Sequence, residues 1–273
     1  MADQEKPFRR LSADELQRFA DDGVICVRDA LPALWLRRIE AGIDNAYSKP
    51  SSIGDIVSMK DRGFMGDLFM WMRDDNFRSV VFDSPLAGLA HQVLGSERVT
   101  HWYDQLFVKE PGAEVPTPWH HDLTFWPVSG RQIVSIWIPL DPVTRSSSGL
   151  EYVRGSHKWP NRYKAITPDF NAYMVNPELE DLPDIDAHRS DYDLLDWNMQ
   201  PGDALVFDPL IIHGSSGNTS TTTRRRALAS RWAGDDVVYN PRKHTMPLPG
   251  DHGLEPGDPL GGSMFPTVIP AAG

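Results

Sequence analysis

Cysteine is nearly absent from this sequence, since Cys26 is the single one among 273 residues. A single cysteine excludes an internal disulfide and a metal site built on several thiolates. No apolar run approaches the roughly 18 residues that a membrane-spanning helix needs, and residues 1–10 lack the apolar segment of a signal peptide. These absences favour a soluble, cytoplasmic protein with no membrane partner.

An excess of positive charge is also missing. The chain carries 27 Lys and Arg against 38 Asp and Glu, a formal net charge of −11. A nucleic-acid-binding protein usually presents a basic face, so no nucleic-acid partner is expected. The one concentrated basic run is Arg224-Arg225-Arg226. A hydrophobic content of 40% with nine Trp is sufficient for one large core, and we expect a single domain over residues 1–273.

Helices are predicted first along the chain. Ser12 and Glu15 form a capping-box pattern before an apolar face, and Gly23 can end that helix. A short buried strand is predicted over 24–27, a second helix over about 32–47, and a third from Pro85 to Gly95. Residues 48–72 are expected to be an irregular loop that covers the site. The helical part spans about residues 10–95.

Strands are predicted over about 98–235, at 98–108, 131–140, 150–153, 204–207 and 225–233. In the first of these, His101, Tyr103 and Gln105 should share one face. Residues 158–200 are polar and are expected to be an insertion over the open end with little regular structure. The Pro- and Gly-rich tail, 236–273, is expected to pack loosely or to cross to a partner, and it permits a homodimer. Helices followed by many short strands indicate an α+β fold with a β-barrel or sandwich.

Trp119-His120-His121-Asp122 carries the first candidate chemistry. Side chains alternate along an extended strand, so His120 and Asp122 point the same way and His121 points to the other face. His213 follows the predicted strand 204–207 and supplies a third ligand. Two histidines and one carboxylate are the facial triad of non-haem Fe(II) oxygenases, which leaves metal positions open for co-substrate and O₂.

The arginine triplet follows His213. A buried Arg grips a carboxylate through two parallel hydrogen bonds, which is what the far carboxylate of 2-oxoglutarate requires.

With these motifs in their order, the sequence resembles the phytanoyl-CoA dioxygenase family of Fe(II)/2-oxoglutarate oxygenases. The resemblance covers roughly residues 10–235. Its matching segments are 119–122, Ser135 to Asp141, Arg154 to Lys158, Pro201-Gly202-Asp203, His213-Gly214-Ser215, Asn218, and the arginine run before Ala227-Leu228.

The resemblance implies a double-stranded β-helix (a cupin-like jelly roll) with flanking N-terminal helices. It implies Fe(II), 2-oxoglutarate and O₂ as cofactor and co-substrates, with His120, Asp122 and His213 as the metal ligands and catalytic centre. The expected activity is hydroxylation of an unactivated C–H bond, coupled to decarboxylation of 2-oxoglutarate to succinate and CO₂. Desaturation or ring closure would need the same residues.

The carboxylate-binding Arg is ambiguous. The family spacing counted from the distal His selects Arg224, whereas counting back from Ala-Leu selects Arg225. We favour Arg224. Further contacts with 2-oxoglutarate are implied for Trp137, Ser215 and Gln105, while Lys109 is interpreted as structural.

Substrate contacts are expected from aromatic and Arg side chains around the barrel mouth. The candidates are Tyr103, Phe125, Trp126, Arg231 and Trp232, with Phe64, Met65, Trp71 and Arg73 from the loop. They suit a small organic molecule with an apolar body and an anionic group. Two alternatives stay open, a cupin-like metal enzyme that uses Zn(II) or Mn(II) without a keto acid, and a non-catalytic jelly roll that binds a ligand.

Overall fold

The computed structural model describes residues 9–164 and 175–270. It begins with the predicted capped helix. Ser12 accepts a hydrogen bond from the backbone of Glu15, whose side chain accepts one in return, and α1 (Ala13–Asp22) follows. Gly23 ends it with φ +84°, a conformation that glycine adopts without a steric penalty. The chain then enters β1 (Val24–Val27), which confirms both predictions.

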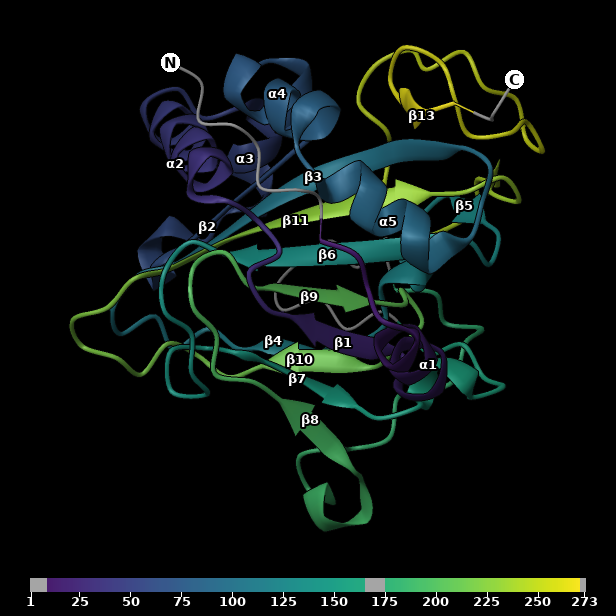
Figure 1. Ribbon diagram of the computed structural model, residues 1–273. Coiled ribbons are helices and arrows are strands. Elements are labelled where there is room, and N and C mark those ends of the chain that lie inside the picture. Colours follow the sequence, from purple (N-terminus) through teal and green to yellow (C-terminus); the bar gives the residue numbers. More distant parts are fainter. Residues whose placement is uncertain (1–8, 165–174, 271–273) are drawn as a thin grey trace.

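Two antiparallel sheets face each other (Figure 1). The first has the order β1-β9-β6-β11-β3-β13, with β2 also paired to β3, and the second has the order β4-β10-β7-β8. Their strands are β2 (Phe64–Leu68), β3 (Val99–Lys109), β4 (Thr117–His120), β6 (Ile133–Pro139), β7 (Leu150–Val153), β8 (Leu194–Asp196), β9 (Ala204–Phe207), β10 (His213–Ser215), β11 (Arg225–Ala233) and β13 (Thr267–Ile269). The strands predicted at 150–153, 204–207 and 225–233 are confirmed at these bounds. This is the predicted jelly roll.

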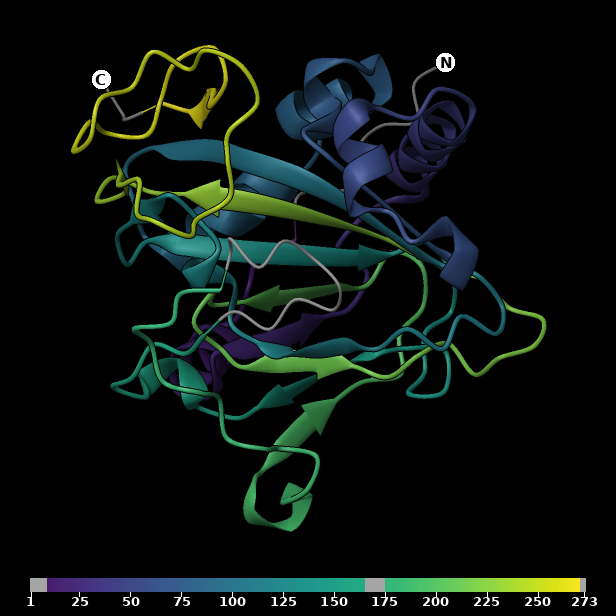
Figure 2. The ribbon, with the colours of Figure 1, turned by 180° about the vertical axis from the view of Figure 1, so that it is seen from behind.

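Helices cover the outer face of the first sheet and, in the case of α3, its β2 edge beside the cavity. These are α2 (Ala33–Ser48), α3 (Ser52–Val57), α4 (Asp75–Asp83) and α5 (Leu86–Leu94). Helix α5 lies across β6 and β11, and α2, α3 and α4 gather near the β3 edge (Figures 1 and 2). Apolar side chains such as Ile39, Phe77 and Leu86 pack there against Ile136 and Leu228 of the sheet. A separate core between the sheets includes Trp137, Phe207 and Tyr152. In the described part of the chain, no helix is long and apolar enough to cross a membrane.

Three regions differ from the sequence prediction. The segment 48–72 is not an irregular loop, because it forms α3, β2 and two single turns of 3₁₀ helix at Lys60–Arg62 and Met70–Met72. Helix α4 was not predicted. The region 158–200, as far as it is described, has little regular structure, as predicted. It contains a 3₁₀ turn at Arg189–Asp191 and β8, which extends the second sheet.

The tail is the third difference, because it does not pack loosely. Its strands β12 (Val238–Tyr239) and β13 pair with β5 (Val128–Ser129) and β3, and Phe265 is fully buried. Arg242 fastens the tail by donating hydrogen bonds to the carbonyls of Leu123, Trp126 and Val128. The tail therefore belongs to the folded body of this chain.

A β-bulge in β3 changes which of its side chains face inward. Arg231 of β11 lies opposite Tyr103, whereas Trp232 lies opposite His101, so Trp102 is an extra residue on β3. His101 consequently contacts Trp232 at 4.9 Å on the outer face, while Tyr103 faces inward. The prediction that His101 and Tyr103 share a face is wrong for this reason.

Candidate functional site

The two histidines of the candidate triad meet across one strand pair. His120 ends β4 and His213 begins β10, and the two residues are direct partners in the antiparallel ladder. Opposite side chains in such a pair are close neighbours, and the two imidazole centroids lie 4.3 Å apart. The third residue, Asp122, begins a 3₁₀ turn (Asp122–Thr124, η3) immediately after β4. Potential ligand atoms of all three lie within 4.8 Å of one another.

The strand ends one residue earlier than the alternation argument assumed. His121 is nevertheless extended, with φ −121° and ψ 142°, so His120 and Asp122 still point the same way. His121 points elsewhere, and its Nε2 accepts a hydrogen bond of 3.1 Å from the backbone N–H of Tyr163. Burial lowers the pKa of His121 to about 3. His121 therefore stays neutral and takes no part in the cluster.

Backbone carbonyls orient both imidazoles. Nδ1 of His120 lies 2.7 Å from the Pro118 carbonyl, and Nδ1 of His213 lies 3.0 Å from the Ile211 carbonyl. A carbonyl only accepts, so each Nδ1 carries the proton and each Nε2 presents a lone pair. These Nε2 atoms lie 3.4 and 3.9 Å from Oδ1 of Asp122. The three free donor atoms converge on one point, as a metal site requires.

The charges and the burial around these three side chains favour the protonation states that bind a cation. Burial by itself would raise the pKa of Asp122, but the Arg231 guanidinium and the neighbouring histidines hold it well below its usual range. Ser135 Oγ also donates to Oδ2 of Asp122 at 3.3 Å. Burial, together with the charge of His120, lowers the pKa of His213 to about 4. At neutral pH, Asp122 is therefore ionised and His213 is neutral.

The triad forms part of the wall of a cavity of about 700 Å³ between the two sheets. Most of its lining is apolar or aromatic, with a few polar groups, as is usual for a small-molecule site. Of the sequence candidates, the lining includes Gln105, Trp137, Arg225, Tyr103, Phe125, Trp126, Arg231 and Phe64.

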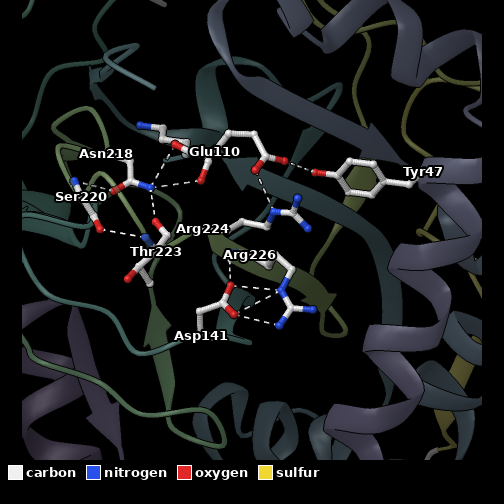
Figure 3. Close-up of polar contacts among 9 residues, drawn as sticks. Tyr47, Glu110, Asp141, Asn218, Ser220, Thr223, Arg224 and Arg226 are labelled. Carbon is white, nitrogen blue, oxygen red and sulfur yellow. Dashed lines mark hydrogen bonds and ion pairs between the residues drawn. The ribbon is translucent and has the colours of Figure 1, made fainter. Parts of the chain in front are cut away.

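The arginine triplet is divided between the cavity and the surface. Arg224 is half-exposed, donates to Glu110 at 2.8 Å and stacks on Tyr47 (Figure 3). Arg226 forms an ion pair with Asp141 and also contacts Glu40. Neither guanidinium reaches the cavity. This placement does not fit our preference for Arg224, whose carboxylate partner is already a surface Glu.

Arg225 is the inward-facing member. It is 2% exposed, its guanidinium lies over the Trp137 ring at 5.8 Å, and it donates to Ser148 Oγ at 3.3 Å. Its buried Nε has no hydrogen-bond partner. Burial lowers the pKa of Arg225 to about 10, so it remains a cation at neutral pH. A buried cation with an unused donor is suited to an incoming carboxylate.

Lys109, which the sequence analysis interpreted as structural, accompanies Arg225. The two are partners across β3 and β11, and Lys109 Nζ donates to Ser148 Oγ, Ser215 Oγ and the Ser216 carbonyl at 2.9 to 3.1 Å. Burial, and then the charge of Arg225, lower the pKa of Lys109 to about 6. Ser215 lies behind this ammonium group and is not part of the cavity lining. On β3, Lys109 continues the inward face formed by Tyr103, Gln105 and Phe107.

Some substrate candidates lie outside the cavity. Trp232 points to the outer face of β11 and packs in the core under the helices, because adjacent strand residues cannot share a face. Met65 and Trp71 are core residues as well, and Arg73 forms an ion pair with Asp67. Two further segments line the cavity, of which the first lies within residues 48–72, the stretch expected to cover the site, and the second was not expected. These are α3, with Ser52, Ile53, Ile56 and Val57, and the tail residues 246–250.

This chain is similar in sequence to a known protein family. The sequence model of one family, described as Phytanoyl-CoA dioxygenase (PhyH), matches residues 19–227. A curated "Probable phytanoyl-CoA dioxygenase" of Caenorhabditis elegans is 30% identical over 248 residues, which cover 83% of this chain and 77% of the relative.

Solved structures share the fold. The non-heme alpha ketoglutarate dependent carbocyclase SnoK from nogalamycin biosynthesis superposes with a TM-score of 0.73 at 22% identity, covering 94% of this chain and 96% of SnoK. The epimerase SnoN, in complex with Fe³⁺, alpha ketoglutarate and nogalamycin RO, gives 0.73 at 19% identity, covering 93% and 97%.

Proposed function

This chain belongs to the phytanoyl-CoA dioxygenase family of Fe(II)/2-oxoglutarate-dependent dioxygenases, and we propose that it hydroxylates an unactivated C–H bond of a small organic molecule. The observation that carries this proposal is the juxtaposition in one cavity. A His-Asp-His cluster lies in its wall, and so does a buried Lys–Arg pair that has no carboxylate partner among the described lining residues. The His-Asp-His cluster suits a metal, and the Lys–Arg pair suits a carboxylate of the co-substrate.

His120, Asp122 and His213 would hold the iron. Two neutral imidazoles and one ionised carboxylate are the donor set that Fe(II) takes in such oxygenases. The carbonyls of Pro118 and Ile211 fix the ring orientations, and Ser135 fixes the carboxylate. Partners of this kind orient metal ligands and strengthen their binding.

Arg225 and Lys109 would bind the far carboxylate of 2-oxoglutarate. Arg225 takes the role for which the sequence favoured Arg224. Trp137 supports the guanidinium from beneath, Ser215 holds the ammonium group, and Gln105 faces the same cavity. When bound, Fe(II) together with 2-oxoglutarate and O₂ supplies the oxidant, and the keto acid leaves as succinate and CO₂. The apolar walls exclude water and orient the substrate.

The test is anaerobic addition of Fe(II) and 2-oxoglutarate, which should produce a weak visible metal-to-ligand charge-transfer band. Arg225→Ala should abolish the band at moderate 2-oxoglutarate or shift its half-saturation upward by about tenfold or more, because a charge-assisted pair is lost. Arg224→Ala is the matched control and should retain the wild-type titration.

Other outcomes would redirect the assignment. Bound iron without a band in the wild type would favour a cupin-like metal enzyme that needs no keto acid. Absence of iron binding would favour a non-catalytic ligand-binding jelly roll. Loss of the band in Arg224→Ala, with Arg225→Ala unaffected, would overturn the choice of Arg225. A single domain, a homodimer and a cytoplasmic location stay predictions from the sequence.

A further inference from the structure

The cavity has an unusual charge for so acidic a protein. The charged residues among its described lining are Lys109, Arg225, Arg231 and Asp122, alongside His120 and His213. A divalent metal, the Asp122 carboxylate and dianionic 2-oxoglutarate together carry one negative charge, which the Arg225 cation offsets even before any positive charge on Lys109 is counted. Arg231 then remains as a buried cation whose neighbouring carboxylate is committed to the metal.

Arg231 is held rigidly with donors to spare. It is 3% exposed, and its guanidinium lies 4.4 Å from the Tyr103 ring centroid and 5.5 Å from that of Trp126. Trp126 Nε1 donates to the Tyr103 hydroxyl at 2.7 Å, which locks the two rings together. The guanidinium is therefore fixed in plane and position before any ligand arrives.

Two donor atoms of Arg231 have no hydrogen-bond partner in the described part of the chain. Nε lies 3.6 Å from Asp122 Oδ2, which is beyond hydrogen-bond length. Both Nε and Nη1 are buried without a hydrogen-bond partner. Buried donors left unpaired are costly, so a ligand that supplies acceptors at this point gains affinity.

We propose that Arg231 binds a carboxylate of the substrate next to the metal ligands. This inference rests on the proposed function and names its substrate class, an apolar molecule that bears one carboxylate close to the oxidised carbon. Phe125 lies beside the triad, and the apolar body would extend toward Ile53 of α3 and Leu248 of the tail. The cavity of about 700 Å³ is larger than the small keto acid requires.

The experiment uses full-length protein loaded anaerobically with Fe(II) and saturating 2-oxoglutarate, so that the co-substrate site is filled. The charge-transfer band is checked first, and its absence would be a failure of the proposed function. Two matched pairs are then titrated. One pair is 1-pyrenebutyrate and 1-pyrenebutanol, followed by fluorescence anisotropy. The smaller pair is 1-naphthylacetate and 2-(1-naphthyl)ethanol, followed by calorimetry.

The wild type should prefer a carboxylate over its matched alcohol by about tenfold or more in Kd. Arg231→Gln should reduce that ratio to nearly one, and Arg231→Lys should keep a preference of a few-fold because the charge remains. Arg224→Gln, a neutralised arginine outside the cavity, should behave as the wild type. The band reports in each variant whether the fold and the metal site are intact.

Three results would overturn the proposal. The first is equal binding of carboxylate and alcohol to the wild type, whether both bind or neither does. The second is a full carboxylate preference in Arg231→Gln. The third is weaker Fe(II) binding by Arg231→Gln with the preference intact, which would make Arg231 a positioning residue for Asp122 alone.

Discussion

Lys109 allows a quantitative test of the co-substrate site. Burial lowers the pKa of its ammonium group to about 6 in the ligand-free protein. At pH 7.5 only about 3% of the molecules would therefore carry the Lys109 charge. A carboxylate bound against Nζ favours the cation and raises this pKa again. Binding of 2-oxoglutarate at pH 7.5 should consequently take up close to one proton.

The direction and size of the pH dependence of 2-oxoglutarate binding follow from this pKa of Lys109. Below pH 6, Lys109 is already charged and binding is independent of this group. Above pH 6, each pH unit costs about 1.4 kcal/mol, or tenfold in affinity, until the pKa of the complex is reached. At pH 7.5 the cost is about 2 kcal/mol, or roughly thirtyfold.

The assay is isothermal titration calorimetry of 2-oxoglutarate into anaerobic protein preloaded with Mn(II). It is repeated at pH 7.5 in PIPES, HEPES and Tris, which differ in ionisation enthalpy. The slope of apparent enthalpy against buffer ionisation enthalpy gives the protons taken up. Lys109→Met removes the titrating group and Lys109→Arg fixes its charge, so both should show a slope near zero. A wild-type slope near zero, or one unchanged in both variants, would refute the reasoning.

Two further predictions concern the support of the site. Ser135→Ala removes the hydroxyl that donates to Asp122 and should weaken Fe(II) binding by about tenfold, measured by metal competition, with an unchanged circular dichroism spectrum. An unaltered affinity would mean that Asp122 is oriented without Ser135. Arg242→Gln removes donors to the carbonyls of Leu123, Trp126 and Val128. It should lower Tm by about 4 °C or more and expose the tail to limited proteolysis, and equal Tm and cleavage would show that the tail is held by packing alone.

Much of the fold was available from local patterns. A capping box depends on residues three apart, and Ser12 with Glu15 identified the first helix correctly. The strand 204–207 was equally readable, because it is a short apolar run bounded by polar or turn residues. Segment 48–72 failed for the opposite reason. Its strand β2 pairs with β3 and its helix α3 packs against β2, and no local sequence pattern predicts these contacts.

The residues of the candidate site also separate into those that local sequence patterns predict and those that long-range contacts decide. The backbone geometry from His120 to Asp122 orients their side chains within three consecutive residues, so the sequence alone could pair them. Arg224 and Arg225 are chemically identical neighbours, and only the pairing of β11 with Lys109 of β3 decides which of them is buried. The bulge at Trp102 likewise decides that Tyr103 meets Arg231 while Trp232 meets His101.

The sequence by itself identified the family and the residues that can ligate a metal, and the resemblance to that family implied the jelly roll. These predictions depend on residue types in a fixed order along the chain. The tertiary structure decided which cations face the cavity, and that α3 and the tail from opposite ends of the chain help to line it. Facing and burial depend on strand register and on packing between distant segments. Those long-range contacts depend on the whole fold, so no short stretch of sequence can predict them.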